Sequence, residues 1–302
     1  IVFAVSFRLL EEEDTAEWRI TRYTKVEDDS QRYSLDCPRR AEKGMQVFNC
    51  SDQPNASRPA IALVGDSHSG HYFPAVAEWA RQNNYELKFL GVPGCPMLVG
   101  EVQIRSLIAD EHAGQCEKAL SHFETGIVGN PNVEVVVIAQ RFDLVLDGIS
   151  YEGENRVIRF LDQDGKAILN HSAYFQERLR ETVQSLRANG KSVVLAGQVP
   201  LFRQVKECGW RPRLMNQQDW QRICSYDQNF IETWQDQSRG FIQDFARDNQ
   251  ALYFDPFPHF QEPVIDGVNL YRDVDHLSNR GELHIAPFVA EVLDKARLNR
   301  FI

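Results

Sequence analysis

The stretch that decides the fold is Ala60-Ile-Ala-Leu-Val-Gly65-Asp-Ser67-His-Ser-Gly-His71. Its apolar run ends at Gly65-Asp66-Ser67, and a helix-like pattern begins immediately afterwards. A run this short, bounded by glycine, is typical of a buried strand in a parallel sheet. Open α/β sheets bind their ligands at the carboxyl ends of the strands, where Ser67 would lie. Two interpretations of Ser67 stay open here: a catalytic nucleophile, or part of an ordinary turn in which Asp66 or Ser67 caps the helix.

Four further short apolar segments follow, separated by segments with helical spacing. They are residues 87–91, 133–139, 192–196 and 251–254. The segment 133–139 is β-branched and almost wholly apolar, which is typical of a central strand. The alternation predicts an α/β fold: a three-layer α/β/α sandwich around a parallel five-stranded sheet, flavodoxin-like if its crossovers are right-handed.

The spacing of apolar residues also predicts the helices. We expect them over residues 72–82, 111–127, 173–188, 229–249 and 281–298. Residues 157–161 are predicted as an edge strand, and residues 201–227 as a long loop insertion.

The chain has 302 residues, with 33 basic and 43 acidic side chains and a net charge of −10. This balance argues against a nucleic-acid partner, which requires clustered Lys and Arg. No run of about 18 apolar residues occurs, so no membrane-spanning helix is predicted. The chain starts with an apolar stretch that lacks an initiator Met. We interpret residues 1–58 as an extension packed on a main domain of residues 59–302, beginning at the end of an excised membrane helix; the alternative is a short N-terminal strand or helix.

The six cysteines fall as three sequence neighbours without the spacing of a metal knuckle. Local disulfides in an oxidising compartment are the simplest interpretation, although other connectivities and reduced, buried thiols stay possible. The three pairs are Cys37 and Cys50, Cys95 and Cys116, and Cys208 and Cys224.

A second motif, Tyr271-Arg-Asp273-Val-Asp275-His276-Leu-Ser278, precedes the last helix. A hydroxyl nucleophile needs a base, and the base needs an orienting acceptor. Asp273, three residues before His276, has the spacing to hold one imidazole nitrogen while the other faces outward. Asp275 is a rival orienter with poorer expected geometry, because it adjoins His276. The alternative is a polar turn that only caps the helix.

Together, Gly65-Asp-Ser67-His68, Gly94-Cys95-Pro96 and Asp273-x-x-His276-Leu-Ser278 resemble motifs of the SGNH/GDSL hydrolase superfamily. The exact residues of these motifs resemble those of the SGNH domain fused to acyltransferase-3 membrane proteins, which O-acetylate bacterial surface polysaccharides. The resemblance covers about residues 60–300. It makes residues 1–58 the extension that follows the last membrane helix.

The resemblance implies that Ser67 is the nucleophile, His276 the base and Asp273 its orienter. The backbone N–H groups of Ser67 and Gly94 would form the oxyanion hole. The superfamily usually adds an Asn donor after the central strand, but this chain has Gln140-Arg141-Phe142 there. The fused acyltransferase domains commonly have an Arg–aromatic pair at that place. Gln140 or Arg141 as the third donor, or a hole with two donors, stay as alternatives, and Arg141 and His68 are candidate substrate contacts.

The implied function is an extracytoplasmic O-acetyltransferase at the periplasmic face of the bacterial inner membrane. The partner would be an acyltransferase-3 membrane domain of the same polypeptide, which would deliver the acetyl group from acetyl-CoA. The acceptor would be a polysaccharide such as lipopolysaccharide O-antigen. No cofactor or metal is expected in this domain, although His68, His71 and Asp66 form an alternative metal site. A stand-alone carbohydrate acetylesterase with the same triad and a carbohydrate-binding domain with a vestigial site are the other candidates.

Overall fold

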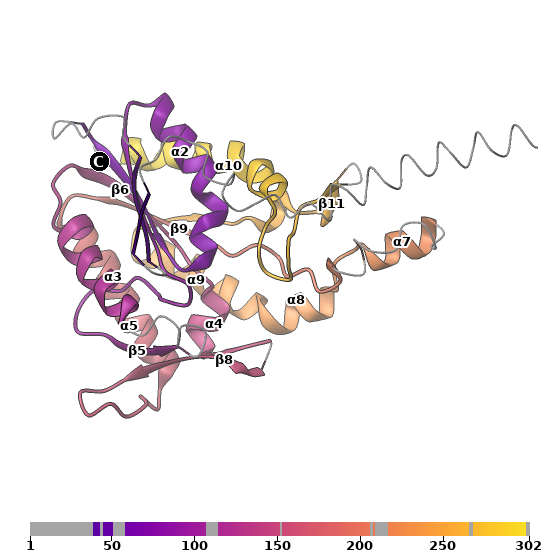
Figure 1. Cartoon of the computed structure of the whole chain (residues 1–302), viewed down its shortest axis with the longest axis horizontal. Helices are drawn as coiled ribbons and strands as arrows, with labels where there is room; N and C mark the ends of the chain where they lie inside the picture. Colours follow the sequence, from indigo (N-terminus) through magenta and orange to yellow (C-terminus); the bar gives the residue numbers. More distant parts are fainter. Residues whose placement is uncertain are drawn as a thin grey trace, which may run out of the picture.

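A parallel sheet forms the centre of the protein (Figure 1). The computed structural model describes residues 39–42, 45–50, 58–106, 114–151, 153–205, 208, 217–265 and 268–299. The parallel strands are β3 (Ala60–Gly65), β4 (Glu86–Gly91), β6 (Val133–Ala139), β9 (Ser192–Ala196) and β10 (Leu252–Phe254). All five lie where the apolar segments predict strands, so the predicted parallel five-stranded sheet is confirmed.

The strand order changes direction at β3. The parallel strands run in the order β4-β3-β6-β9-β10, so the chain leaves β3 towards one side and later returns to its other side. Gly65 at the end of β3 pairs with Gly91 of β4 and Ala139 of β6. In open α/β sheets the ligand crevice lies at such a change of direction, outside the carboxyl ends of the strands.

Helices cover both faces of the sheet (Figure 1). Ile61 and Leu63 pack towards α2 (Phe73–Gln82) and α10 (Asn279–Asn299) on one face. Ala62 and Val64 point to the other face, as the two-residue period of a strand requires. That face is covered by α3 (Gln115–Phe123), α4 (Phe142–Asp147), α5 (His171–Ala188) and α9 (Asp236–Asp248). Because both faces are covered, the strands are apolar on both sides.

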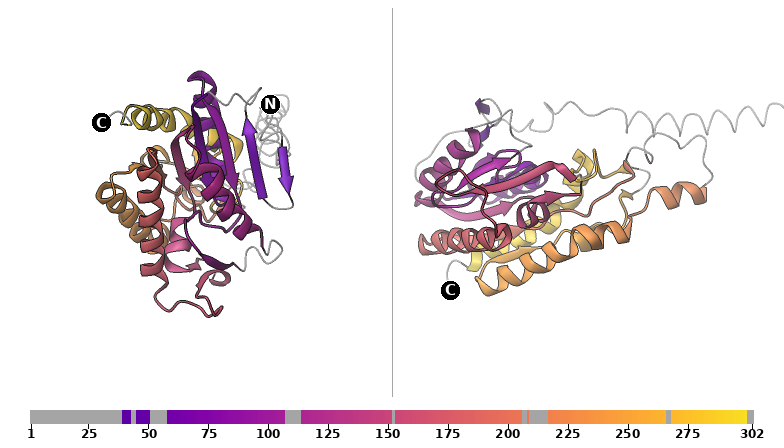
Figure 2. Two further views of the ribbon diagram at one scale, coloured as in Figure 1. Left: turned by 90° about the vertical axis from the view of Figure 1, so that its left-hand side faces the viewer. Right: turned by 90° about the horizontal axis from the view of Figure 1, so that it is seen from below.

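Two antiparallel strands extend the sheet beside β4, where they are drawn in indigo and purple (Figure 2). They are β1 (Arg39–Glu42) and β2 (Met45–Cys50), and β2 pairs with β4. Within the described residues the sheet therefore has seven strands, two more than the five predicted. β1 is polar, and both strands are short and lie in a segment without clear periodicity, so the sequence pattern did not reveal them. Residues 1–38 and 51–57 lie outside the described residues.

A small separate sheet contains the predicted edge strand 157–161. That strand is the end of β8 (Gly153–Leu161), which pairs with β5 (Gln103–Ser106) and β7 (Ile149–Ser150). The segment is a strand, as predicted, but β8 is the central strand of this small sheet and not an edge strand. Short elements complete the fold: η1 (Ser67–Tyr72), the turn Glu124–Val128, α7 (Gln217–Ile223), η4 (Phe257–His259), β11 (Val264–Ile265) and β12 (Val268–Asn269).

The predicted helix 229–249 is two helices, α8 (Gln228–Trp234) and α9. Gln235 separates them, and its side chain is fully buried. Its Oε1 accepts a hydrogen bond from the N–H of Leu201 at 2.8 Å, and its Nε2 donates to the carbonyl of Val199 at 2.9 Å. The helix thus breaks where it fixes the loop that follows β9.

Two of the three expected disulfides lie within the described residues, Cys95–Cys116 and Cys208–Cys224. The first ties the loop after β4 to α3, and its Cα atoms are 5.5 Å apart. The pair Cys37 and Cys50 lies outside the described side chains. Within the ranges that the structure describes, no helix has the length and apolar character needed to cross a bilayer.

Candidate active site

Gly65 ends β3 at a place with no room for a side chain. Its φ is +152°, and a Cβ atom would lie 1.7 Å from the carbonyl oxygen of Ala139 in β6. Glycine lets the two backbones approach this closely. The chain therefore turns out of the sheet immediately before Asp66 and Ser67.

Asp66 fixes the turn that presents Ser67. Its carboxylate is 2 % exposed; Oδ1 accepts from the N–H of His68 at 2.9 Å, and Oδ2 accepts from the N–H of Arg141 at 2.8 Å. The first bond caps η1, and the second joins this turn to the loop after β6. Asp66 is thus the capping residue, and both of its oxygens bind backbone, which argues against the alternative of a metal ligand.

Ser67 is the first residue of η1, and its hydroxyl meets the loop before α10. Its Oγ lies 2.8 Å from Nε2 of His276. On the far side of the ring, Nδ1 of His276 lies 2.9 Å and 3.1 Å from the two carboxylate oxygens of Asp273. The structure therefore brings together the three residues predicted as a triad, in the expected order of nucleophile, base and orienter.

The loop that carries His276 is closed on itself and anchored to the fold. Asp273 Oδ1 also accepts from the backbone N–H of His276 at 2.8 Å. The N–H of Arg272 donates to the carbonyl of His276 at 3.0 Å, and the N–H of Phe202 donates to the carbonyl of Val274 at 2.8 Å. Leu277 is fully buried. These contacts hold the imidazole in place without help from a substrate.

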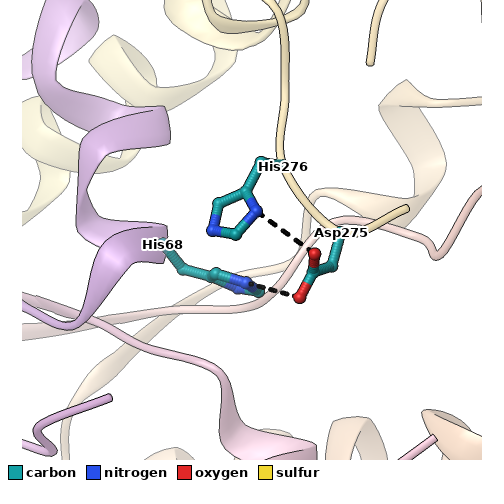
Figure 3. Close-up of side chains that lie close together, drawn as sticks. All are labelled: His68, Asp275 and His276. Atoms are coloured by element: carbon teal, nitrogen blue, oxygen red, sulfur yellow. Dashed lines mark ion pairs between the residues drawn. The ribbon is translucent and has the colours of Figure 1, made fainter. Parts of the chain in front are cut away.

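Asp275 adds a carboxylate that the sequence analysis ranked below Asp273. Its Oδ1 lies 3.1 Å from Nδ1 of His276, and its Oδ2 lies 3.6 Å from Nε2 of His68. Figure 3 shows the carboxylate between the two imidazoles, one from η1 and one from the loop before α10. The side chain of Asp275 is 5 % exposed, whereas that of Asp273 is 49 % exposed. Sequence adjacency to His276 hid this contact.

Arg141 lies under the site and neutralises its buried carboxylates. Its Nη1 is 2.9 Å from Oδ2 of Asp275, its Nε is 3.1 Å from Oδ1 of Asp143, and its Cζ is 4.7 Å from the ring centre of Tyr151. Burial alone lowers the pKa of Arg141, but Asp143 and Asp275 outweigh it, and the pKa is raised. Arg141 and His68, the predicted substrate contacts, are 3 % and 1 % exposed. Both therefore lie beneath the site.

The surroundings favour a protonated His276. Burial by itself lowers the pKa of the imidazole, but Asp273 and Asp275 outweigh burial and raise the pKa of His276 to about 9. For Asp275, burial by itself raises the pKa of the carboxyl group, but the contacts with His276 and His68 outweigh burial and hold that pKa well below its ordinary value. Opposite charges in a buried site stabilise one another in this way.

His68, Asp275 and His276 offer ligand atoms within 4.8 Å of one another, a spacing that suits a metal ion. The donor set does not fit a cation well, because the guanidinium of Arg141 already lies 2.9 Å from the same carboxylate. A metal bound there would also compete for the His276 ring that contacts Ser67. His71 accepts from the N–H of Leu277 at 3.4 Å and is 4.9 Å from the His68 ring. We therefore interpret His68 and His276 as two imidazoles positioned by the carboxylate of Asp275, and not as ligands of a metal ion.

Gly94 lies at the same sheet edge as Ser67. It follows β4, and the N–H of Val92 donates to the carbonyl of Gly65 at 3.1 Å, joining the two loops. Gly94 has φ of +67°, a conformation that favours glycine, and the next residue, Cys95, is held by its disulfide. The structure thus places Gly94 in the loop after β4, the strand that neighbours β3, and Ser67 follows β3.

Gln140 occupies the place of the missing Asn and is fully buried. Its Oε1 accepts from the N–H of Met97 at 3.2 Å, which connects it to the loop of Gly94. Its Nε2 has no hydrogen-bond partner within the described part of the chain. The guanidinium of Arg141, by contrast, is engaged by Asp143 and Asp275. Of the two alternatives for a third donor, Gln140 is the one with an uncommitted N–H.

Comparison with solved structures finds similarity to several bacterial proteins. The periplasmic domain of the lipopolysaccharide acetyltransferase of Salmonella ser. Paratyphi A aligns with a TM-score of 0.53 and 11% identity, covering 79% of this chain and 85% of that chain. A putative SGNH hydrolase of Slackia heliotrinireducens gives 0.47 and 13% identity, covering 78% and 100%. A catalytic mutant of the acetylxylan esterase Axe2 of Geobacillus stearothermophilus gives 0.46 and 12%, covering 77% and 93%.

No curated protein sequence matches the chain significantly. A family model does match, over residues 34–291, and its description is the SGNH domain fused to AT3 domains. The match begins before β1 and ends within α10, so it includes the two edge strands and every motif of the site. The chain belongs to the family of SGNH domains that are fused to AT3 domains.

Proposed function

We propose that this chain is the extracytoplasmic domain of an O-acetyltransferase, and that it passes an acetyl group through Ser67 to a hydroxyl of a bacterial cell-surface polysaccharide. The observation that carries the proposal is the 2.8 Å contact of Ser67 Oγ with His276 Nε2, backed by Asp273, at the carboxyl end of β3. A serine held this way has a base for its proton and an acceptor that orients the base.

In the first step Ser67 Oγ attacks the carbonyl carbon of the acetyl donor while Nε2 of His276 takes the hydroxyl proton. The tetrahedral oxyanion receives hydrogen bonds from the backbone N–H groups of Ser67 and Gly94, with Nε2 of Gln140 as the candidate third donor. When the intermediate collapses, His276 returns its proton to the leaving group. Acetyl-Ser67 and the protonated leaving group are the products of this half-reaction.

In the second step a sugar hydroxyl attacks acetyl-Ser67. His276 takes the proton of that hydroxyl, the new ester bond forms, and the bond to Ser67 Oγ breaks. The proton then returns to Ser67. Water in place of the sugar gives acetate, so the same residues also support hydrolysis of acetyl esters.

The family supports the choice of partner. Because its members are fused to AT3 domains, we propose an AT3 membrane domain of the same polypeptide as the source of the acetyl group, drawn from acetyl-CoA. The Salmonella domain with the same fold is described as a periplasmic domain of a lipopolysaccharide acetyltransferase, which supports a periplasmic location and a polysaccharide acceptor such as O-antigen.

The test first measures the hydrolysis of a chromogenic acetyl ester by the purified wild-type domain and by the Ser67→Ala variant. We expect turnover that depends on Ser67. Equal turnover by both proteins contradicts catalysis at this site and favours a binding domain. Adding oligosaccharide acceptors then separates the two enzymatic functions: acetylated sugar supports a transferase, whereas release of acetate alone, also in the polypeptide that includes its AT3 domain, supports an esterase.

A further inference from the structure

Two carboxylates face one nitrogen of His276. Asp273 approaches Nδ1 at 2.9 Å, and Asp275 approaches it at 3.1 Å. A triad needs one orienting carboxylate, and the motif spacing supplies Asp273. The presence of Asp275 at nearly the same distance therefore calls for a separate role.

The two carboxylates differ most in their surroundings. The side chain of Asp273 is 49 % exposed, and Nε of the partly exposed Arg272 lies 3.6 Å from its Oδ2. Solvent and salt screen such a charge strongly. The side chain of Asp275 is 5 % exposed, and a charge in a buried site acts on its neighbours with much less screening. Distance alone therefore understates the effect of Asp275 on His276.

The fold also ensures that Asp275 stays ionised. Arg141, 3 % exposed, places Nη1 at 2.9 Å from Oδ2. His68 lies on the same side with Nε2 at 3.6 Å, which is an electrostatic contact and too long for a hydrogen bond. A buried carboxylate without such partners would take up a proton. Arg141 thus keeps Asp275 negative and available to the His276 ring.

We propose that Asp275 is a second positioning residue of the reaction, and that the buried set of Arg141, Asp275 and His68 fixes the tautomer and the charge of His276 jointly with the exposed Asp273. This inference rests on the proposed function of Ser67 and His276. It predicts that the acidic residue of the family motif is partly redundant in this chain, because Asp275 lies close enough to Nδ1 to accept its hydrogen bond when Asp273 is lost.

Other charged and titratable groups near His276 also influence its charge or that of Asp273. From η1, the rings of His68 and His71 lie 5.0 Å and 5.5 Å from the His276 ring, and a positive charge on either opposes protonation of His276. Asp66 directs both oxygens to backbone N–H groups and is engaged there. Arg272 faces Asp273 from within the same loop, the one that carries His276.

The test compares Asp273→Asn, Asp275→Asn and the double variant, with Asp255→Asn as matched control. Asp255 directly follows the parallel strand β10 and, like Asp275, pairs with an arginine, since Nη2 of Arg239 lies 2.6 Å from it. No contact joins Asp255 to His276 within the described residues. For each protein we measure kcat/KM on a chromogenic acetyl ester over pH, and the titration of His276 by NMR of labelled imidazole.

We expect Asp275→Asn to lower kcat/KM by at least about tenfold, which corresponds to about 1.4 kcal/mol of transition-state stabilisation. Its pH midpoint and the pKa of His276 fall together. Asp273→Asn keeps activity above that of Ser67→Ala, and the double variant loses this remainder. Asp255→Asn keeps the wild-type midpoint.

Two results overturn the inference. One is wild-type kcat/KM and an unchanged midpoint for Asp275→Asn; the other is Asp273→Asn at the level of Ser67→Ala. The second result is informative even if Asp275→Asn fails to fold, because Asp273 is exposed. The NMR titration reports on Asp275 without any turnover. Failure of the proposed function is distinct, since it appears as equal activity of wild type and Ser67→Ala.

Discussion

Ser67 Oγ and His276 Nε2 lie 2.8 Å apart although 209 positions separate the two residues in the chain. The contact arises because β3 is the first strand of the parallel series, and the closing helix α10 packs on the face of the sheet that carries Ile61 and Leu63 of β3. Gly65 turns the chain out of β3, and the loop before α10 returns over the same edge. The proposed chemistry depends on this closure between the two ends of the domain.

The pH dependence of activity follows from the charges around His276. A general base acts only when it has lost its proton. Because Asp273 and Asp275 outweigh burial and raise the pKa of His276 to about 9, we expect kcat/KM to rise with pH and level off only above about pH 9. A pH–rate profile on an acetyl ester measures this directly. A midpoint at the ordinary histidine value contradicts the proposed influence of the two carboxylates.

The same shift affects stability, with the opposite sign. The pKa of His276 is higher in the folded protein than the ordinary value of 6.5, so the folded state holds the proton more tightly. The resulting stabilisation is fully present below the unfolded pKa and is lost as pH rises through about 9. Thermal melting of wild type and His276→Gln over this pH range measures it. The two proteins should approach each other in melting temperature at alkaline pH; a difference that grows with pH contradicts the assignment.

Gly65→Ala should be severely destabilising. A Cβ atom at this position would lie 1.7 Å from the carbonyl oxygen of Ala139, so β3 and β6 must separate. We expect a loss of more than about 4 kcal/mol in the free energy of unfolding, which is exceptional for a point substitution. Gly240→Ala in α9 is the control, because nothing lies within 4 Å of its Cβ position and alanine favours a helix. Denaturant unfolding of both variants tests the difference, and similar stabilities would argue against the close approach.

Removal of the Cys95–Cys116 disulfide should affect both stability and activity. A loop of this size is expected to contribute about 3 kcal/mol in the chain-entropy model. The bond also holds the residue next to Gly94, so Cys95→Ser with Cys116→Ser should lower kcat/KM as well. The matching pair of substitutions at Cys208 and Cys224 should lower stability with a smaller effect on kcat/KM. Equal kcat/KM losses from the two pairs would contradict a role for the Gly94 loop.

Metal removal should leave activity unchanged. The cluster of His68, Asp275 and His276 has the spacing of a metal site, but Arg141 lies 2.9 Å from its carboxylate. We expect identical turnover before and after dialysis against a chelator. Loss of activity that returns with a divalent cation contradicts the interpretation of His68 and His276 as imidazoles positioned by Asp275.

The parallel sheet and the three residues of the predicted triad were accessible from the sequence for physical reasons. A buried strand must be apolar on both faces, so residues 60–65 and 133–139 stand out. The glycine before Asp66 marks the turn, and the spacing of Asp273 and His276 marks a possible orienter and base. Strands β1 and β2 were not predictable in the same way, because both are short, β1 is polar, and their place in the sheet depends on tertiary contact with β4.

The surroundings of His276 were harder to predict from the sequence. Adjacent residues usually point apart, which favours Asp273 over Asp275, yet the turn brings both carboxylates to Nδ1. Arg141 was expected at the substrate, but Asp275 and Asp143 draw its guanidinium beneath the site. Likewise, only the contacts of Gln235 with the loop after β9 explain why α8 and α9 are separate helices. Such features depend on partners far away in the chain.

The central claim is that Ser67 carries the acetyl group. The most direct measurement is rapid quenching of the wild-type domain mixed with an activated acetyl ester, followed by peptide mass spectrometry. We predict one acetyl group on the peptide that contains Ser67, absent from Ser67→Ala and strongly reduced in His276→Gln. Turnover of the ester without acetyl-Ser67, at the same rate in wild type and Ser67→Ala, would contradict it.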